Sequence, residues 1–167
     1  MCKHAPAMLS VLRSPLLQAN GFVHGFSLRH GGTSAAPFES LNLGRSVGDD
    51  PARVEENRRR FAAAVGFDAV TLFEVNQVHG ADVHLLTSGD LPACVRQVEA
   101  DALCVVGRSA AVAVRVADCV PVLLADPESG SVAAVHAGWR GTVARLIEAA
   151  VARLREQTAA PAARLLA

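Results

Sequence analysis

Three short segments of this chain place a metal-ligating side chain where a predicted strand gives way to a turn. They are Gln77-Val78-His79-Gly80, Ala117-Asp118-Cys119-Val120-Pro121 and Val135-His136-Ala137-Gly138-Trp139-Arg140-Gly141. Side chains at such positions project from the edge of a sheet, and two imidazoles with one thiolate suit zinc. Three protein ligands leave one coordination position open, and zinc in such a site activates water at neutral pH. His79, Cys119 and His136 are therefore candidate ligands of a catalytic metal.

The spacing of these residues leaves alternatives open, because 40 and 17 positions separate them and no local metal motif spans them. Each could be an ordinary histidine or a core cysteine. A metal-free dyad is also consistent, with His136 holding Cys119 as a thiolate nucleophile and Asp118 or another polar group orienting it. Because dyad and metal site need the same atoms close together, the sequence alone does not separate them.

A candidate anion site follows His136. Gly138 and Gly141 remove side-chain bulk around Arg140, and a helix predicted to start near Thr142 presents unpaired N–H groups there. The guanidinium of Arg140 could bind a phosphate or a carboxylate through bidentate hydrogen bonds. The alternative is that Arg140 pairs with a surface carboxylate while Trp139 fills the core. Arg29, after an early predicted strand, is a second candidate anion contact.

The N-terminal elements are predicted from apolar patterns and turn residues. Residues 22–28 are expected to form a strand, followed by a loop at Arg29-His30-Gly31-Gly32-Thr33-Ser34. Asp49-Asp50-Pro51 is typical of a helix start, and Val54, Phe61 and Val65 would share one face of that helix. Residues 58–60, all arginine, are expected on its solvated face. The expected i,i+4 pairs are Glu55 with Arg59 and Glu56 with Arg60.

The second half of the chain changes to short runs rich in β-forming residues. Strands are expected at residues 71–76, 81–87, 102–106, 111–117, 120–125 and 131–136. Asp126-Pro127-Glu128-Ser129-Gly130 predicts a hairpin turn. A helical stripe of Val143, Leu146, Ile147, Ala150 and Leu154 follows. Tight hairpins favour a mixed or antiparallel sheet covered by helices, an α+β arrangement, over a doubly wound parallel sheet.

Length and charge narrow the class of protein. The chain has 167 residues, 51% of them hydrophobic, and Lys+Arg 16 balance Asp+Glu 16. Zero net charge and no dense basic stripe argue against a nucleic-acid surface and a membrane surface. The longest apolar run, residues 119–125, is far below the ~20 residues that span a bilayer. No signal peptide is recognised at the N-terminus, so we expect a cytoplasmic protein.

The four cysteines show no Cys-x-x-Cys spacing, and in a cytoplasm they would stay reduced. They are Cys2, Cys94, Cys104 and Cys119. Cys94 and Cys104 are expected to be small buried hydrophobic residues.

Taken together, these segments resemble a known family. Further matching motifs are Arg29-His30-Gly31-Gly32-Thr33-Ser34, Ser40-Leu41-Asn42-Leu43-Gly44, Val47-Gly48-Asp49-Asp50 and Glu56-Asn57-Arg58. The chain resembles the YfiH-like family, also called the laccase-domain or multicopper polyphenol oxidase family and peptidoglycan editing factor, from about Phe22 to near Glu156. The resemblance implies a mixed α/β sandwich, with residues 1–20 as an N-terminal extension and residues 21–167 as a YfiH-like domain that is short at its C-terminus.

The resemblance also implies an activity and site residues. Zinc would be held by His79, Cys119 and His136, and the reactions would be phosphorolysis of adenosine, inosine and methylthioadenosine and deamination of adenosine. Arg29, Asn42 and Arg140 would bind substrate. Asp118 would shuttle protons, although as a strand neighbour of Cys119 it would point to the opposite face. The partners are then a purine nucleoside and phosphate.

Other readings of the resemblance remain. Copper could occupy the same ligands and oxidise phenols, but the chain has no His-x-His run and only two methionines, Met1 and Met8. Hydrolysis of a peptidoglycan precursor by Cys119 and His136, or by activated water, is another. An inactive fragment is the last, because residues 164–167 look like the start of a strand. An open sheet edge there would predict poor solubility or a homodimer.

Overall fold

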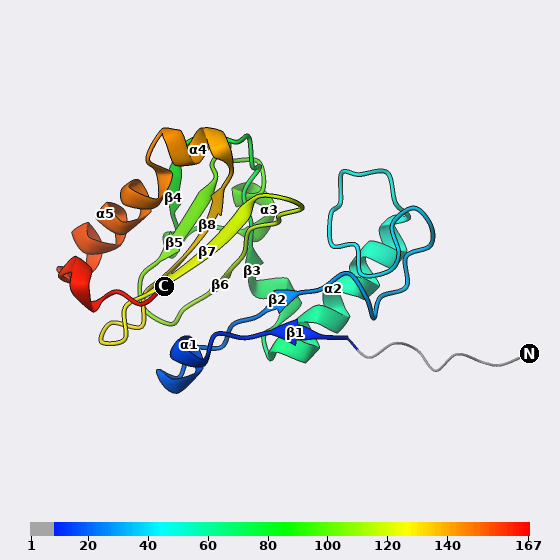
Figure 1. Ribbon diagram of the computed structural model, residues 1–167, viewed down its shortest axis with the longest axis horizontal. Coiled ribbons are helices and arrows are strands. Elements are labelled where there is room, and N and C mark those ends of the chain that lie inside the picture. Colours follow the sequence, from blue (N-terminus) through cyan, green and yellow to red (C-terminus); the bar gives the residue numbers. More distant parts are fainter. Residues whose placement is uncertain (1–8) are drawn as a thin grey trace, which may run out of the picture. The chain divides into compact units, whose positions relative to one another are not determined.

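The computed structural model describes residues 9–167, whose contacts divide into two compact units, one ending at Ala69 and the other spanning Val70–Ala167 (Figure 1). Met1, Cys2 and Met8 lie outside the described residues. The domain boundary predicted at residue 21 stays a prediction. Across residues 9–167, no helix is both long and apolar enough to cross a bilayer. The units are described separately.

The first unit is built around one helix. β1 (Val11–Leu12) pairs antiparallel with β2 (Phe26–Ser27), and α1 (Pro15–Ala19) lies between them in the chain. The long helix is α2 (Pro51–Val65), capped at its start by the Asp50 side chain and ended by Gly66 in the left-handed conformation. The predicted helix start is confirmed, while the predicted strand over 22–28 shortens to two residues.

The prediction that residues 58–60 of α2 face solvent is wrong for Arg58. Arg58 is buried and donates a hydrogen bond to the backbone oxygen of Leu43 at 2.8 Å, which offsets part of the cost of burying its guanidinium. Of the two expected ion pairs only one forms as expected, between Glu56 and Arg60 at 2.7 Å. Glu56 also pairs with Arg59 at 2.9 Å.

The second unit is a four-stranded sheet in the order β4-β5-β8-β7. Its strands are β4 (Val83–Leu85), β5 (Ala102–Val105), β7 (Val120–Ala125) and β8 (Val132–Ala137). β4 is parallel to β5, whereas β5–β8 and β7–β8 are antiparallel. The mixed α/β fold is thereby confirmed, and the β7–β8 hairpin turns where residues 126–130 predicted it.

Shorter elements lie before, between and after these strands in the chain. β3 (Leu72–Phe73) pairs in parallel with β6 (Ala111–Val112), and single turns of helix are η1 (Ala69–Thr71), α3 (Pro92–Val95) and η2 (Ala162–Arg164). The strand expected over 111–117 ends at residue 112, although its valines alternate. Cys94 in α3 is exposed, contrary to prediction, because this short helix carries it on the outside of the unit.

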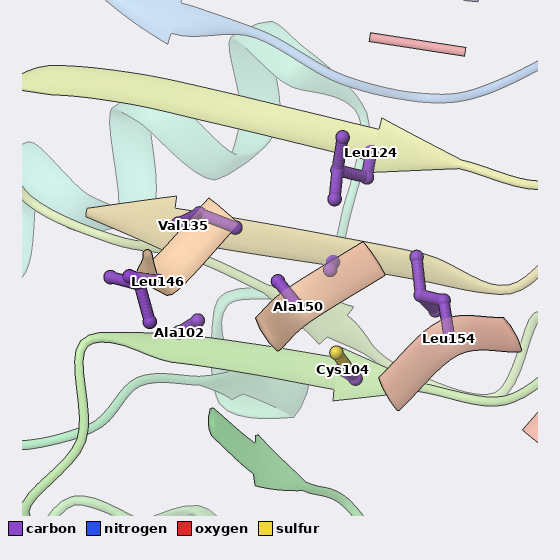
Figure 2. Packing of buried hydrophobic residues seen from close by; sticks show 8 residues of the cluster. Ala102, Cys104, Leu124, Val135, Leu146, Ala150 and Leu154 are labelled. Atoms are coloured by element: carbon purple, nitrogen blue, oxygen red, sulfur yellow. The ribbon is translucent and has the colours of Figure 1, made fainter. Parts of the chain in front are cut away.

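The core of the second unit lies between the sheet and α5 (Leu146–Thr158) (Figure 2). Leu146, Ala150 and Leu154 follow one face of α5 and pack on buried residues of β5, β7 and β8, including Cys104. Burial raises the pKa of the Cys104 thiol to about 12, so it acts as a small hydrophobic residue as predicted.

The predicted final helix is divided in two. α4 (Trp139–Val143) ends before Arg145, whose φ of 64° is left-handed, and α5 then begins at Leu146. Val143, expected on the buried stripe, is 77% exposed, since the break at Arg145 interrupts the helical period that it would share with Leu146. Near the chain end, Leu166 pairs antiparallel with Ala125 of β7, and Arg164 lies in η2.

Candidate metal centre

His79, Cys119 and His136 lie together, as predicted, at one end of the four-stranded sheet. Their ligand atoms are all within 4.8 Å of one another, and the two imidazole rings meet edge to face with centroids 4.8 Å apart. The strand directions bring these residues together, because β4, β5 and β7 begin, and β8 ends, at the same end of the sheet. His79 precedes β4, Cys119 directly precedes β7, and His136 is near the end of β8.

Asp101 organises this cluster, and the sequence analysis missed it. Its side chain is fully buried and accepts a hydrogen bond from Nδ1 of His136 at 2.7 Å. It also accepts from three consecutive backbone N–H groups, those of Val78 at 3.1 Å, His79 at 3.0 Å and Gly80 at 2.6 Å. Burial disfavours the charged carboxylate, but the four donors outweigh it and hold the pKa of Asp101 below its ordinary value. One anion therefore ties the His79 loop to His136.

The backbone of His79 depends on this anion. Its φ of 61° lies in the left-handed region, which non-glycine residues rarely adopt and which costs of order 1–3 kcal/mol. The hydrogen bonds from residues 78–80 to Asp101 offset that cost. They fix the turn that brings the imidazole of His79 beside that of His136.

The cluster fits a metal ion in three respects. Two nitrogens and one sulfur form a borderline-soft donor set. Since Nδ1 of His136 donates to Asp101, its Nε2 is left as an acceptor, the arrangement usual for a metal-bound imidazole. Gly138 keeps the space open, because a Cβ there would lie 3.2 Å from Cδ2 of His79 and 3.3 Å from Sγ of Cys119.

The surroundings of Cys119 argue against the metal-free dyad. Burial, followed by the carboxylates of Asp118 and Asp101, raises the pKa of the Cys119 thiol. A thiol in this environment stays protonated at neutral pH unless a cation compensates. A metal ion at the cluster would supply that charge.

Asp118 lies beside Cys119 rather than on an opposite face. Residues 117–119 form a bend before β7, so strand alternation does not apply to them. The thiol of Cys119 donates to Oδ1 of Asp118 at 3.7 Å, and Asp118 is exposed. The expectation of opposite faces is therefore wrong.

Arg140 and Trp139 lie next to Gly138 at the start of α4. Trp139 is 71% exposed, so it does not fill the core. The guanidinium carbon of Arg140 is 5.2 Å from the centre of the Trp139 ring, a cation–π contact. Among the described residues Arg140 has no carboxylate partner, which leaves its charge available to an anion.

Arg29 and Asn42 belong to the first unit, so their role toward substrate stays a prediction. Arg29 donates from Nε and Nη2 to the backbone oxygen of Glu39 at 3.1 and 2.9 Å. Asn42 donates to Oδ2 of Asp49 at 2.9 Å and accepts from the N–H of Gly44 at 2.9 Å. Both side chains brace the loop that precedes α2.

The side chain of Asn57, which was not predicted from the sequence, holds this loop by hydrogen bonds. Asn57 of α2 is fully buried; it donates to Ser34 Oγ at 2.8 Å and to the backbone oxygens of Ser40 at 3.1 Å and Asn42 at 3.0 Å. Its Oδ1 accepts from the N–H of Thr33 at 2.7 Å. The Asn57 amide thus joins two of the loop motifs quoted for the family resemblance, those at residues 29–34 and 40–44.

Comparisons with known proteins agree with this architecture. The family described as "Multi-copper polyphenol oxidoreductase laccase" matches residues 23–167. The chain is 50% identical over 145 residues to a purine nucleoside phosphorylase of Streptomyces coelicolor, covering 86% of this chain and 58% of that protein. It is 43% identical over 154 residues to a purine nucleoside phosphorylase of Deinococcus radiodurans, covering 92% and 56%.

Solved structures give the same result. The crystal structure of YlmD from Geobacillus stearothermophilus matches with a TM-score of 0.77 at 34% identity, covering 84% of this chain and 54% of that one. That of YfiH from Bacillus licheniformis matches with a TM-score of 0.71 at 28% identity, covering 84% and 55%. The chain thus spans about half the length of the curated relatives and solved structures that it matches.

Proposed function

Because the chain belongs to the multi-copper polyphenol oxidoreductase laccase family, we propose that it is a zinc-dependent purine nucleoside phosphorylase. The observation that carries this proposal is the cluster of His79, Cys119 and His136 around a space kept open by Gly138. It occurs in a chain whose relatives are named purine nucleoside phosphorylases. The expected substrates are adenosine, inosine and methylthioadenosine, converted with phosphate to the base and ribose 1-phosphate.

The metal-binding chemistry is supported by the ligands and their partner. His79, Cys119 and His136 would hold zinc, and Asp101 would keep His136 in the tautomer that presents Nε2. A bound zinc ion supplies Lewis acidity and activates water, which also suits deamination of adenosine. The family description names copper. The thiolate and two imidazoles of this chain are also a usual donor set for zinc, and the proposed reactions need no redox metal.

Arg140 is the proposed phosphate-binding residue. Arg140 is exposed beside the cluster, and its guanidinium can hold phosphate in a two-pronged contact while phosphate attacks the ribose carbon. Arg29 and Asn42 are proposed further substrate contacts. Asp118, exposed beside Cys119, is the proposed proton carrier for the departing base or for deamination.

The test combines metal analysis with a reaction. The wild-type protein should carry zinc and release hypoxanthine from inosine in the presence of phosphate, and Cys119→Ala should lose both. Cys94→Ala is the matched control, since Cys94 is exposed on α3 and should change neither. Failure of the wild-type protein to form hypoxanthine would contradict the proposed reaction, and activity in metal-free protein would favour the Cys119/His136 dyad.

A second comparison tests the phosphate site. Arg140→Ala should raise the KM for phosphate while leaving the zinc content unchanged. Arg153→Ala removes an exposed arginine of α5 and should leave both unchanged. An unchanged KM in Arg140→Ala would remove Arg140 from the proposed site.

A further inference from the structure

We propose that Gln77 is a positioning residue that fixes Cys119 relative to His79. The side-chain amide of Gln77 makes two hydrogen bonds with the backbone of one residue, Arg115. Its Nε2 donates to the Arg115 carbonyl at 2.7 Å, and the Arg115 N–H donates to its Oε1 at 2.8 Å. The amide thus joins the segment that leads to Cys119 to the segment that carries His79.

The two hydrogen bonds between Gln77 and Arg115 lie just beyond the end of the β3–β6 strand pairing. The parallel pair β3–β6 covers only two residues on each strand, and one more backbone bond, from Ala113 N–H to Phe73 O at 3.0 Å, extends it. Two residues later the Gln77 side chain takes the place of a neighbouring strand, since it offers Arg115 both a donor and an acceptor. Pairing between the two segments therefore continues past the end of the sheet.

An ion pair between Arg115 and Glu74 joins the same two segments. Nη1 of Arg115 lies 3.2 Å from Oε1 of Glu74, which is buried on the segment before Gln77. The pair holds the side chain of Arg115 while Gln77 holds its backbone.

Cys119 needs such a support because its own segment is irregular. Residues 113–119 form neither helix nor strand, and Cys119 follows Arg115 by four residues while His79 follows Gln77 by two. Four unrestrained residues can move their end by many ångströms, since each spans up to about 3.3–3.6 Å. Asp101 already ties the His79 loop to His136, and Gln77 adds the link from the His79 segment to the Cys119 segment.

The inference rests on the proposed metal site, and the test reads the metal directly. Cobalt(II) replaces zinc in sites with nitrogen and sulfur ligands, and its thiolate-to-metal charge-transfer band reports whether Cys119 is a ligand. The wild-type protein is titrated with cobalt and, separately, with zinc against a chromophoric chelator. Gln77→Ala removes both hydrogen bonds to Arg115, whereas Gln77→Glu keeps an acceptor but loses the donor.

In Gln77→Ala we expect the charge-transfer band to weaken strongly and zinc affinity to fall about tenfold to a hundredfold. Gln77→Glu should give a smaller change in the same direction and carries the test if Gln77→Ala does not fold. The control is Gln97→Ala, because Gln97 is exposed and its side chain makes no hydrogen bond within residues 9–167. It should behave as wild type.

The outcomes separate the two proposals. If wild-type protein gives no band that Cys119→Ala abolishes, the metal site itself fails and the role of Gln77 fails with it. If wild type gives the band but folded Gln77 variants keep its intensity and the zinc affinity, only the role of Gln77 is overturned. Lower thermal stability with an unchanged band and affinity would assign Gln77 a purely structural role and would equally overturn the inference.

Discussion

Replacing Asp101 with asparagine should weaken both the fold of the second unit and its hold on metal. Oδ1 of Asp101 accepts from the His79 N–H and from Nδ1 of His136, and Oδ2 accepts from the N–H groups of Val78 and Gly80. Asparagine has one acceptor oxygen, so its NH₂ group would face two N–H donors. Two hydrogen bonds to a buried charge are lost, each worth about 1.5–3 kcal/mol, for a total of about 3–6 kcal/mol.

The metal should be affected separately. With its Nδ1 partner altered, His136 loses the group that fixes its tautomer and ring orientation, and changes of this kind reduce metal affinity about 10–100-fold. That range corresponds to about 1.4–2.7 kcal/mol of binding free energy. The His79 turn should also loosen, since its left-handed backbone is supported by the same carboxylate.

Two measurements distinguish these effects. Denaturant unfolding of metal-free protein gives the stability loss, and zinc competition against a chelator gives the affinity. Asp82→Asn is the matched control, since Asp82 is exposed and its side chain makes no hydrogen bond or ion pair among the described residues. The reasoning is refuted if Asp101→Asn unfolds within about 1 kcal/mol of wild type, less than the loss of a single charged hydrogen bond, and binds zinc as tightly as wild type.

Two further predictions concern space and charge. Gly138→Ala should lower zinc affinity with little loss of stability, because the new Cβ would lie 3.2 and 3.3 Å from side-chain atoms of two proposed ligands, His79 and Cys119. Gly89→Ala is the control, since no atom lies within 4 Å of the Cβ added there; equal zinc affinities in the two variants would contradict the proposed site. Arg164 holds the pKa of Asp126 down to about 2, so the stability of this pair is present above about pH 4 and lost as pH falls toward about 2. Arg164→Gln should reduce stability at neutral pH and flatten its decline over that acid range, and an unfolding profile parallel to wild type would contradict the assignment.

The sequence predicted best those features that follow from side-chain type and order. The start of α2 at Asp50, the turn between β7 and β8, and the apolar face of α5 at Leu146 and Leu154 are all confirmed. The three ligands were proposed from residue type and family resemblance, and they meet because strand ends converge at one edge.

The errors come from contacts that no local pattern encodes. Alternation over residues 111–117 predicts a strand, but after Ala113, whose N–H still bonds the backbone of Phe73, the partner of Arg115 is the side chain of Gln77. Arginine is usually solvated, yet Arg58 is buried and bonds the backbone carbonyl of Leu43, in a loop 15 residues earlier. Val143 fits the helical period and is exposed because the helix breaks at Arg145.

The residues missed at the site share one physical property, which is that their partners are mostly backbone groups. Three of the four donors to Asp101 are backbone N–H groups, and the Gln77 side chain bonds the backbone N–H and carbonyl of Arg115. Every residue except proline carries the same N–H, so the sequence around such a partner holds no signal of it. A metal ligand is recognised by its own chemistry, whereas the residue that positions it is defined by where the chain passes. The ligand set can therefore be proposed from sequence, but the groups that set its geometry emerge only once the backbone is known.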